Sequence, residues 1–194
     1  MGRRITVING HPDPRPERLV HALADAYAAG ALAAGHEVRR IDVAALEFPL
    51  LARAADWETG SVPPGLAAAQ ADIGWAEHLV ILYPLWLGAM PALLKGFLEQ
   101  VFRPGFAIDP GARSLNGGRL KGRSARIVVT MGMPALVYRW YFGAHSLKSL
   151  ERNILRFVGF APVRATIVGM VGAAGEGRQR RWLDRLRRLG AAGR

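Results

Sequence analysis

The sequence predicts an α/β protein in which a five-stranded parallel sheet lies between two layers of helices. Three observations predict this three-layer αβα sandwich. Short apolar runs recur along the chain, segments with a 3.6-residue apolar period separate them, and the runs read as strands buried on both faces. With 194 residues and 51% apolar content the chain can bury one good core, and we expect a single domain over 1–194.

The predicted elements alternate along the chain. The strands are short apolar runs, the second being more polar and therefore nearer an edge, and they span 5–9, 37–43, 78–83, 126–131 and 164–168. The helices carry apolar stripes at helical spacing and span 19–32, 65–76, 91–102, 145–158 and 176–189. Two segments rich in glycine or proline have no period, 44–64 and 103–122, and we expect them to be irregular.

The loop after the third predicted strand is the most informative part of the chain. It joins the apolar run 78–83 to a helix whose stripe runs through 90–102, with Pro91 in its first turn. In open α/β sheets, flat ligands bind at the carboxyl ends of such central strands. Trp86 would give a planar ring a wall, unless it packs in the core or in a subunit interface. The candidate ring-binding residues are Pro84, Leu85, Trp86, Leu87 and Gly88.

The loop after the first predicted strand favours an anion. It leads into a helix N-terminus, where unpaired N–H groups and the helix dipole attract negative charge. His11, Arg15 and Arg18 add side-chain donors suited to a phosphate. The alternative interpretation is a rigid proline turn with exposed charges.

The loop after the fourth predicted strand combines glycine with methionine, which lets the backbone approach a ligand closely. Its candidate residues are Thr130, Met131, Gly132 and Met133. An aromatic cluster follows, ending near His145, and it would form one side of a substrate pocket. In the alternative interpretation these aromatic side chains pack against the core. The cluster consists of Tyr138, Trp140, Tyr141 and Phe142.

Composition narrows the function. The chain has no cysteine, so disulfides and thiolate chemistry are excluded, and no metal site is predicted. No apolar run reaches the length of a membrane span, and we expect a soluble cytoplasmic protein. The net charge is +11, and many of the arginines lie in the last predicted helix. Without a nucleic-acid motif, we interpret this charge as a solvated helix face and expect no nucleic-acid partner.

The two commonest nucleotide fingerprints, Gly-x-Gly-x-x-Gly and Gly-x-x-x-x-Gly-Lys-Ser/Thr, are absent. What remains is a five-stranded sheet with candidate loops after strands 1, 3 and 4, the arrangement that holds FMN in sheets of order 2-1-3-4-5. The chain resembles the flavodoxin-like NAD(P)H:quinone oxidoreductases. The segment 83–97 is similar to the family's Pro-Leu-x-Trp loop and to the helix start Pro-x-x-Leu-Lys-x-Trp/Phe that follows it. Gly10-His11-Pro12 is similar to the family's Ala-His-Pro, and the segment 157–160 is similar to its Phe-Cys-Gly-Phe/Leu.

The resemblance implies a flavodoxin-like fold and a role for each loop. The loop 84–88 would line the isoalloxazine, His11 would lie near the phosphate or ribityl chain, and 130–133 would hold the pyrimidine edge. Tyr138 has the spacing from Thr130 of a tyrosine that the family places over the flavin, and Tyr138 and His145 are the candidate catalytic donors. At the phosphate loop the family's Ser, aromatic residue and Asn are replaced by Pro16, Glu17 and Arg18, and Arg15 or Arg18 would compensate.

The function that the resemblance implies is hydride transfer from NAD(P)H, through flavin N5, to quinone-type acceptors by a ping-pong mechanism. FMN is the expected cofactor, with FAD as the alternative, NAD(P)H is the expected co-substrate, and a homodimer is expected. Two other functions compete. An electron carrier of the flavodoxin type is disfavoured because such carriers are acidic, and a regulatory subunit that binds flavin or nucleotide resembles the ancillary proteins of potassium-efflux systems.

Overall fold

A parallel five-stranded sheet forms the centre of the protein, and its strand order is β2-β1-β3-β4-β5. The computed structural model describes residues 2–111, 117–173 and 175–194. The strands are β1 (Arg4–Asn9), β2 (Glu37–Asp42), β3 (His78–Pro84), β4 (Ser124–Thr130) and β5 (Val163–Val168). The predicted fold class, strand order and edge position of the second strand are confirmed.

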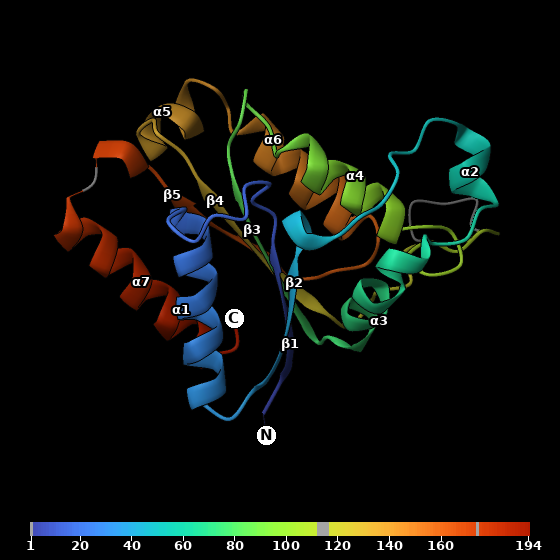
Figure 1. Ribbon diagram of the computed structural model, residues 1–194, viewed down its shortest axis with the longest axis horizontal. Helices are drawn as coiled ribbons and strands as arrows, with labels where there is room; N and C mark the ends of the chain where they lie inside the picture. The colour runs from blue at the N-terminus through green and yellow to red at the C-terminus, as the bar shows by residue number, and fades with distance from the viewer. Residues whose placement is uncertain (1, 112–116, 174) are drawn as a thin grey trace.

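Helices cover both faces of this sheet (Figure 1). On one face lie α1 (Leu19–Ala33) and α7 (Glu176–Ala191), which share one apolar cluster with the sheet. On the other face lie α3 (Ala67–Trp75), α4 (Ala92–Val101) and α6 (His145–Lys148), which continues into a π-helical segment, Ser149–Arg156. All seven residues of β3 are buried, as expected of a central strand covered on both sides.

The two helices on the first face touch through their backbones. A Cβ atom on Gly30 of α1 would lie 2.0 Å from the carbonyl oxygen of Arg187 in α7. A Cβ atom on Gly190 of α7 would lie 2.0 Å from the carbonyl oxygen of Tyr27 in α1. Only glycine permits this approach, so α1 and α7 form a close pair along one face of the sheet.

The structure adds helices to segments expected to be irregular. Within 44–64 it contains α2 (Ala54–Glu58), which has no buried residue and therefore left no apolar period to detect. A separate helix α5 (Ala135–Trp140) precedes α6, and short 3₁₀ turns occur at Val43–Ala45, Pro64–Leu66 and Val171–Ala173. In the predicted irregular segment 103–122, residues 112–116 lie outside the described residues, and the rest contains turns and isolated bridges.

Candidate functional site

Four loops meet at the carboxyl ends of the strands, at the top of the sheet in Figure 1. They enclose a cavity of about 390 Å³, which we call the carboxyl-edge cavity. Ligands of open α/β sheets bind at this edge, where the connections from two neighbouring strands lead to helices on opposite faces of the sheet. The lining includes His11 and the start of α1, the loop after β3, the loop after β4, and residues that follow β5. Its members are His11, Glu17, Arg18, Leu19, Val20, Pro84, Leu85, Trp86, Thr130, Met131, Gly132, Val171, Gly172 and Gln179.

The loop between β1 and α1 gathers its two arginines around one carboxylate. Arg15 donates to Asp13 through Nε at 2.9 Å and through Nη2 at 2.6 Å, and Arg18 Nε donates to the same oxygen at 2.7 Å. The hydrogen bonds from Arg15 hold the pKa of the Asp13 carboxyl well below its usual range. Arg18 lines the cavity and Arg15 does not. The predicted phosphate donors are therefore already paired within their own loop.

His11 is a buried part of the wall. Its Nδ1 accepts a hydrogen bond from the Asp13 backbone N–H at 3.0 Å. Its ring meets the Trp86 ring edge-on, with centroids 5.7 Å apart, and lies 5.6 Å from the His21 ring. Burial, reinforced by the neighbouring His21, lowers the pKa of His11, so the imidazole is neutral at pH 7. His11 thus contributes a neutral ring to the cavity.

The first turn of α1 supplies unpaired backbone donors to the same cavity. Leu19 and Val20 are the first two residues of the helix and line the cavity, and neither N–H group has a partner in the described part of the chain. Arg18, at the N-cap, makes no capping bond with its side chain. These groups lie at the positive end of the helix dipole, where proteins commonly bind phosphate groups.

The loop after β3 is a tight turn. Trp86 and Ala89 exchange two backbone hydrogen bonds, each 2.9 Å long, and Leu87 and Gly88 between them have φ of 46° and 78°. Two positive φ values in a two-residue loop are typical of a type I′ turn. The Leu85 N–H donates to the Thr130 carbonyl at 2.7 Å, so the loop is tied to β4. Pro84, Leu85 and Trp86 line the cavity, whereas Leu87 and Gly88 lie at the tip of the turn, outside the lining.

The loop after β4 divides its residues between the core and the cavity. The Met131 side chain is buried in the core, and its N–H donates to the Val168 carbonyl at 2.9 Å. Met133 packs against the same core and does not line the cavity. No heavy atom of the described residues lies within 4 Å of the position of a Cβ on Gly132, which leaves open space beside its backbone. Thr130 and Gly132 are thus the residues of this loop that a ligand would meet first.

The structure places the two candidate catalytic residues away from the cavity lining. Tyr138 lies in α5 and is buried in the core, where its hydroxyl is 2.8 Å from Ser146 Oγ and accepts the Leu147 N–H at 3.2 Å. His145 begins α6 and is exposed. The remaining aromatic residues do not share one environment, since Trp140, Tyr141 and Phe142 are exposed while Tyr138 packs inside.

Sequence reasoning missed the contribution of the fifth strand. Val171, Gly172 and Gln179 line the cavity from the segment between β5 and α7. A signal was present, because the glycines at 169 and 172 follow a predicted strand as those of the other loops do. Among the described residues, no group of three or more His, Asp or Glu is arranged to hold a metal ion. No described helix combines the length and the apolarity that a membrane crossing requires.

Comparisons with known proteins identify relatives of this chain. Two curated relatives match part of the chain: rat NAD(P)H dehydrogenase (quinone) 1 is 27% identical over 121 residues, 60% of this chain and 43% of that protein. The glutathione-regulated potassium-efflux system ancillary protein KefG of Escherichia coli is 42% identical over 66 residues, 33% of each chain. The matches therefore span less than half of these relatives' own length.

Solved structures show the same fold. The NAD(P)H:quinone oxidoreductase of Methanothermobacter marburgensis superimposes with a TM-score of 0.82 at 21% identity, over 98% of this chain and 96% of that one. An FMN-dependent NADH-azoreductase of Bacillus anthracis, solved with FMN, gives 0.76 at 15% identity, over 99% of each. A family model described as a flavodoxin-like fold matches residues 3–189. The chain belongs to that flavodoxin-like family.

Proposed function

We propose that this protein is a flavin-dependent NAD(P)H oxidoreductase that reduces quinones or related acceptors. The observation that carries the proposal is the carboxyl-edge cavity, which combines a helix N-terminus, an aromatic turn and an open glycine. The relatives named as quinone dehydrogenases and azoreductase support the same reaction class. When bound, a flavin would supply the two-electron chemistry that amino-acid side chains lack.

The residues of the cavity fit a flavin. Its volume of about 390 Å³ lies within the ~300–1,000 Å³ usual for small-molecule sites. The unpaired N–H groups of Leu19 and Val20 would hold the phosphate, and the Trp86 turn would flank the ring. Gly132 leaves room for the pyrimidine edge, because no described residue occupies the space beside its backbone. Fixed backbone donors at that edge would stabilise negative charge on the ring.

The test is reconstitution of the purified chain with FMN and, separately, with FAD. We expect the chain to become yellow, with FMN retained more tightly, and to oxidise NAD(P)H when a soluble quinone is present. Double-reciprocal plots at several quinone concentrations should be parallel, as a ping-pong mechanism requires. A chain that remains colourless with both flavins would overturn the proposal.

The catalytic roles of Tyr138 and His145 stay predictions. Because the Tyr138 hydroxyl is held by Ser146 and the Leu147 amide, a Tyr138→Phe variant also reports on structure. If the hydroxyl acts on the acceptor, turnover falls while the flavin is retained and the melting temperature changes little. Unchanged turnover would remove Tyr138 from the mechanism, and the matching His145→Asn variant tests the exposed histidine in the same way.

A homodimer is part of the proposal. Helix α5 and the turn after it expose five large apolar side chains next to the loop that lines the cavity: Leu136, Val137, Trp140, Tyr141 and Phe142. Exposed apolar patches of this kind are typical of protein interfaces. Sedimentation of the flavin-loaded protein should give twice the mass of one chain. A Trp140→Glu variant, with a charge at the most exposed position, should sediment as a monomer.

A regulatory subunit is the second candidate, and one observation favours it. A groove of about 470 Å³ between α5 and α7 is lined by Trp182 and four arginines, namely Arg178, Arg181, Arg185 and Arg188. Such a surface suits an acidic partner. Turnover separates the two functions, because an enzyme consumes NAD(P)H with quinone on its own, whereas a modulator acts only when its partner is present.

A further inference from the structure

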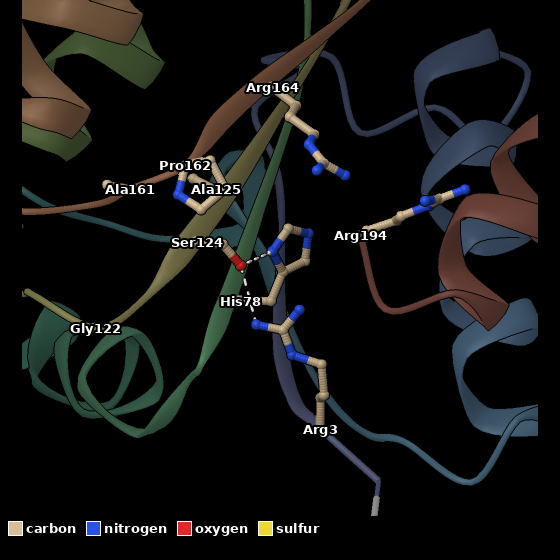
Figure 2. Close-up of a pocket in the computed structure, with 9 residues that line it drawn as sticks. All are labelled: Arg3, His78, Gly122, Ser124, Ala125, Ala161, Pro162, Arg164 and Arg194. Carbon is tan, nitrogen blue, oxygen red and sulfur yellow. Dashed lines mark hydrogen bonds between the residues drawn. The ribbon is translucent and has the colours of Figure 1, made fainter.

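A second cavity lies at the opposite edge of the sheet, where the strands begin (Figure 2). We call it the amino-edge cavity. It has a volume of about 260 Å³, and its lining includes Arg3, His78, Ser124, Arg164 and Arg194. No predicted function uses any of these residues. Figure 2 shows the His78 ring between the guanidinium groups of Arg3 and Arg164.

Among the polar residues that line this cavity, His78 and Arg164 belong to strands, and with the nearby Arg126 they lie on the face of the sheet that α1 and α7 cover. Alternate residues of a strand point to the same face. Val80, two positions after His78, packs against α1 and α7, and so His78 points to the same face. The same argument places Arg126 by Val128 and Arg164 by Val168. The register pairs Arg126 with Arg164 and His78 with Ser124 on neighbouring strands. Backbone geometry therefore holds these groups together.

The arginines at this edge lack an ion-paired carboxylate among the described residues. None of the ion pairs formed by the described residues includes Arg3, Arg126 or Arg164. Arg126 is only 6% exposed and donates to Thr166 Oγ1 at 2.8 Å, while its Nε has no partner in the described part of the chain. The nearby Glu77 is engaged by Arg4, whose backbone N–H lies 3.0 Å from the Glu77 carboxylate. A buried cation without a counterion is unfavourable, so this region is short of negative charge.

His78 contributes a buried ring nitrogen to the same region. It is 2% exposed, and its Nδ1 lies 2.8 Å from Ser124 Oγ, which also accepts a hydrogen bond from Arg3 Nη2 at 3.0 Å. The Ser124 hydroxyl can accept from Nδ1 as well as donate to it, and in the tautomer in which Nδ1 accepts, the neutral ring carries its hydrogen on Nε2. The Nε2 atom is buried without a partner in the described residues. Burial, followed by Arg3 and Arg126, lowers the pKa of His78 to about 3, which keeps the ring neutral.

We infer that the amino-edge cavity is a binding site for a small tetrahedral oxyanion, a phosphate ion or the terminal phosphoryl group of a larger molecule. Its donors would be the guanidinium of Arg164, the N–H groups of Arg3 that are not already bonded to Gly193, Glu77 and Ser124, and the His78 Nε2–H of the tautomer that carries one. Arg126, which acts electrostatically on His78, adds a buried positive charge nearby. Guanidinium groups match phosphate oxygens in geometry and charge. The cavity is smaller than the ~300–1,000 Å³ of sites for drug-sized ligands, which fits an ion or one phosphoryl group.

The test uses the full chain in a buffer free of phosphate and sulfate, with calorimetric titration of inorganic phosphate and, separately, of phenyl phosphate. We expect phosphate to bind and to raise the melting temperature of the chain. Charge-assisted hydrogen bonds are strong enough that Arg164→Gln should weaken binding roughly tenfold or more. Arg152→Gln is the matched control, because Arg152 is an exposed arginine on the opposite face and its replacement changes the net charge equally.

A second variant, at Arg126, tests the inference independently of Arg164→Gln. Arg126→Met replaces the buried cation by an apolar side chain, which should raise the melting temperature without phosphate and abolish the increase caused by phosphate. Phenyl phosphate that binds as tightly as phosphate identifies the ligand as a phosphoryl group on a larger molecule, and weaker binding identifies the free ion. Absence of binding by both ligands, or equal weakening in Arg164→Gln and Arg152→Gln, would overturn the inference.

Discussion

The two edges of the sheet both collect arginines, but they treat the charge differently. At the carboxyl edge, Arg15 and Arg18 belong to a loop and fold back onto Asp13. At the amino edge, Arg126 and Arg164 belong to neighbouring strands, and the register of the sheet holds them side by side. Neither arginine forms an ion pair with a carboxylate of the described residues. A loop residue can find a partner by rotating and moving its backbone, whereas a strand residue is held where the sheet puts it.

The comparison teaches where a ligand is needed most. The exposed ion pairs of the carboxyl edge contribute little to stability and leave that edge electrostatically satisfied. The buried cation of the amino edge is unfavourable until an anion arrives. Conversely, the carboxyl edge offers backbone N–H groups and open space, which suit a larger ligand with a flat ring. The predictions below test this contrast, beginning with the largest expected effect.

The largest effect concerns His78 and acid. The pKa of His78 is about 3 in the folded protein and 6.5 in the unfolded chain. Between pH 6.5 and pH 3 the unfolded chain therefore binds more protons than the folded protein, so the fold loses stability as the pH falls from 6.5. We expect this residue to reduce the unfolding free energy by up to ~1.4 kcal/mol per pH unit over that window. Urea unfolding between pH 7 and pH 4 measures the slope. The slope should become shallower with saturating phosphate and in His78→Asn, and an unchanged slope in both would contradict the electrostatic contrast.

The second effect concerns the open space at Gly132. A valine there would meet no existing heavy atom within 4 Å of its Cβ but would fill the space assigned to the flavin. We expect Gly132→Val to weaken FMN binding about 100-fold, which corresponds to ~2.7 kcal/mol. Phosphate binding at the amino edge should not change. Gly177→Val is the matched control, because Gly177 also has open space at its Cβ but lies outside the cavity lining, and FMN affinity should be unaltered there.

A smaller effect concerns Asp13. Replacing Asp13 by Asn removes the carboxylate that holds Arg15 and Arg18, so the guanidinium of Arg18, which lines the cavity, becomes available to the flavin phosphate. We expect FMN affinity to increase roughly fivefold, the effect of removing one exposed negative charge at short distance. Fluorescence titration of FMN measures it. Asp56→Asn, which breaks a similar exposed pair with Arg53, should leave FMN affinity unchanged.

The smallest effect concerns backbone strain at the tip of the β3–α4 turn. Leu87 has φ of 46° and is fully exposed, which disfavours a leucine at that position. Leu87→Asn would create the Asn-Gly pair that type I′ turns prefer, and we expect it to stabilise the fold by ~0.5–1 kcal/mol. Chemical denaturation measures the change. A destabilised variant would show that the leucine side chain makes a stabilising contact, and would place it in an interface such as that of the proposed dimer.

Much of the fold could be predicted because its signals are local and strong. The buried apolar run that ends at Tyr83 and the stripe of the following helix predicted β3 and α4 within a residue or two. The alternation of strands and helices predicted the parallel sheet, and the candidate loops after strands 1, 3 and 4, with the family resemblance, predicted the strand order. Helix α2 could not be predicted, since a five-residue helix without buried residues has no apolar period. Helix α5 follows Pro134 and has only six residues, and Tyr138 is its one buried side chain, so it also lacks an apolar period.

The site was predicted in outline and missed in detail. Its three loops were identifiable from prolines, glycines and aromatic residues, but the pairing of Arg15 and Arg18 with Asp13 depends on the path of a proline-rich loop that no pattern encodes. Tyr138 has a suitable spacing, yet its hydroxyl faces Ser146 in the core, and only tertiary packing decides that. The amino-edge cluster did leave a signal, because Arg126 interrupts an otherwise apolar strand.

The backbone contact between α1 and α7 has one more consequence. Helix α7 contributes Gln179 to the carboxyl-edge cavity, and the carbonyl of Gly193, just beyond its last turn, accepts a 2.7 Å hydrogen bond from Arg3 at the other edge. Its 16 residues span ~24 Å and are pressed against α1 through Gly30 and Gly190. Helix α7 therefore connects a residue that lines the carboxyl-edge cavity with a segment that is bonded to Arg3 of the amino-edge cavity. By reciprocity, whatever phosphate does to flavin affinity, flavin must do to phosphate affinity, and four binding constants close that thermodynamic cycle.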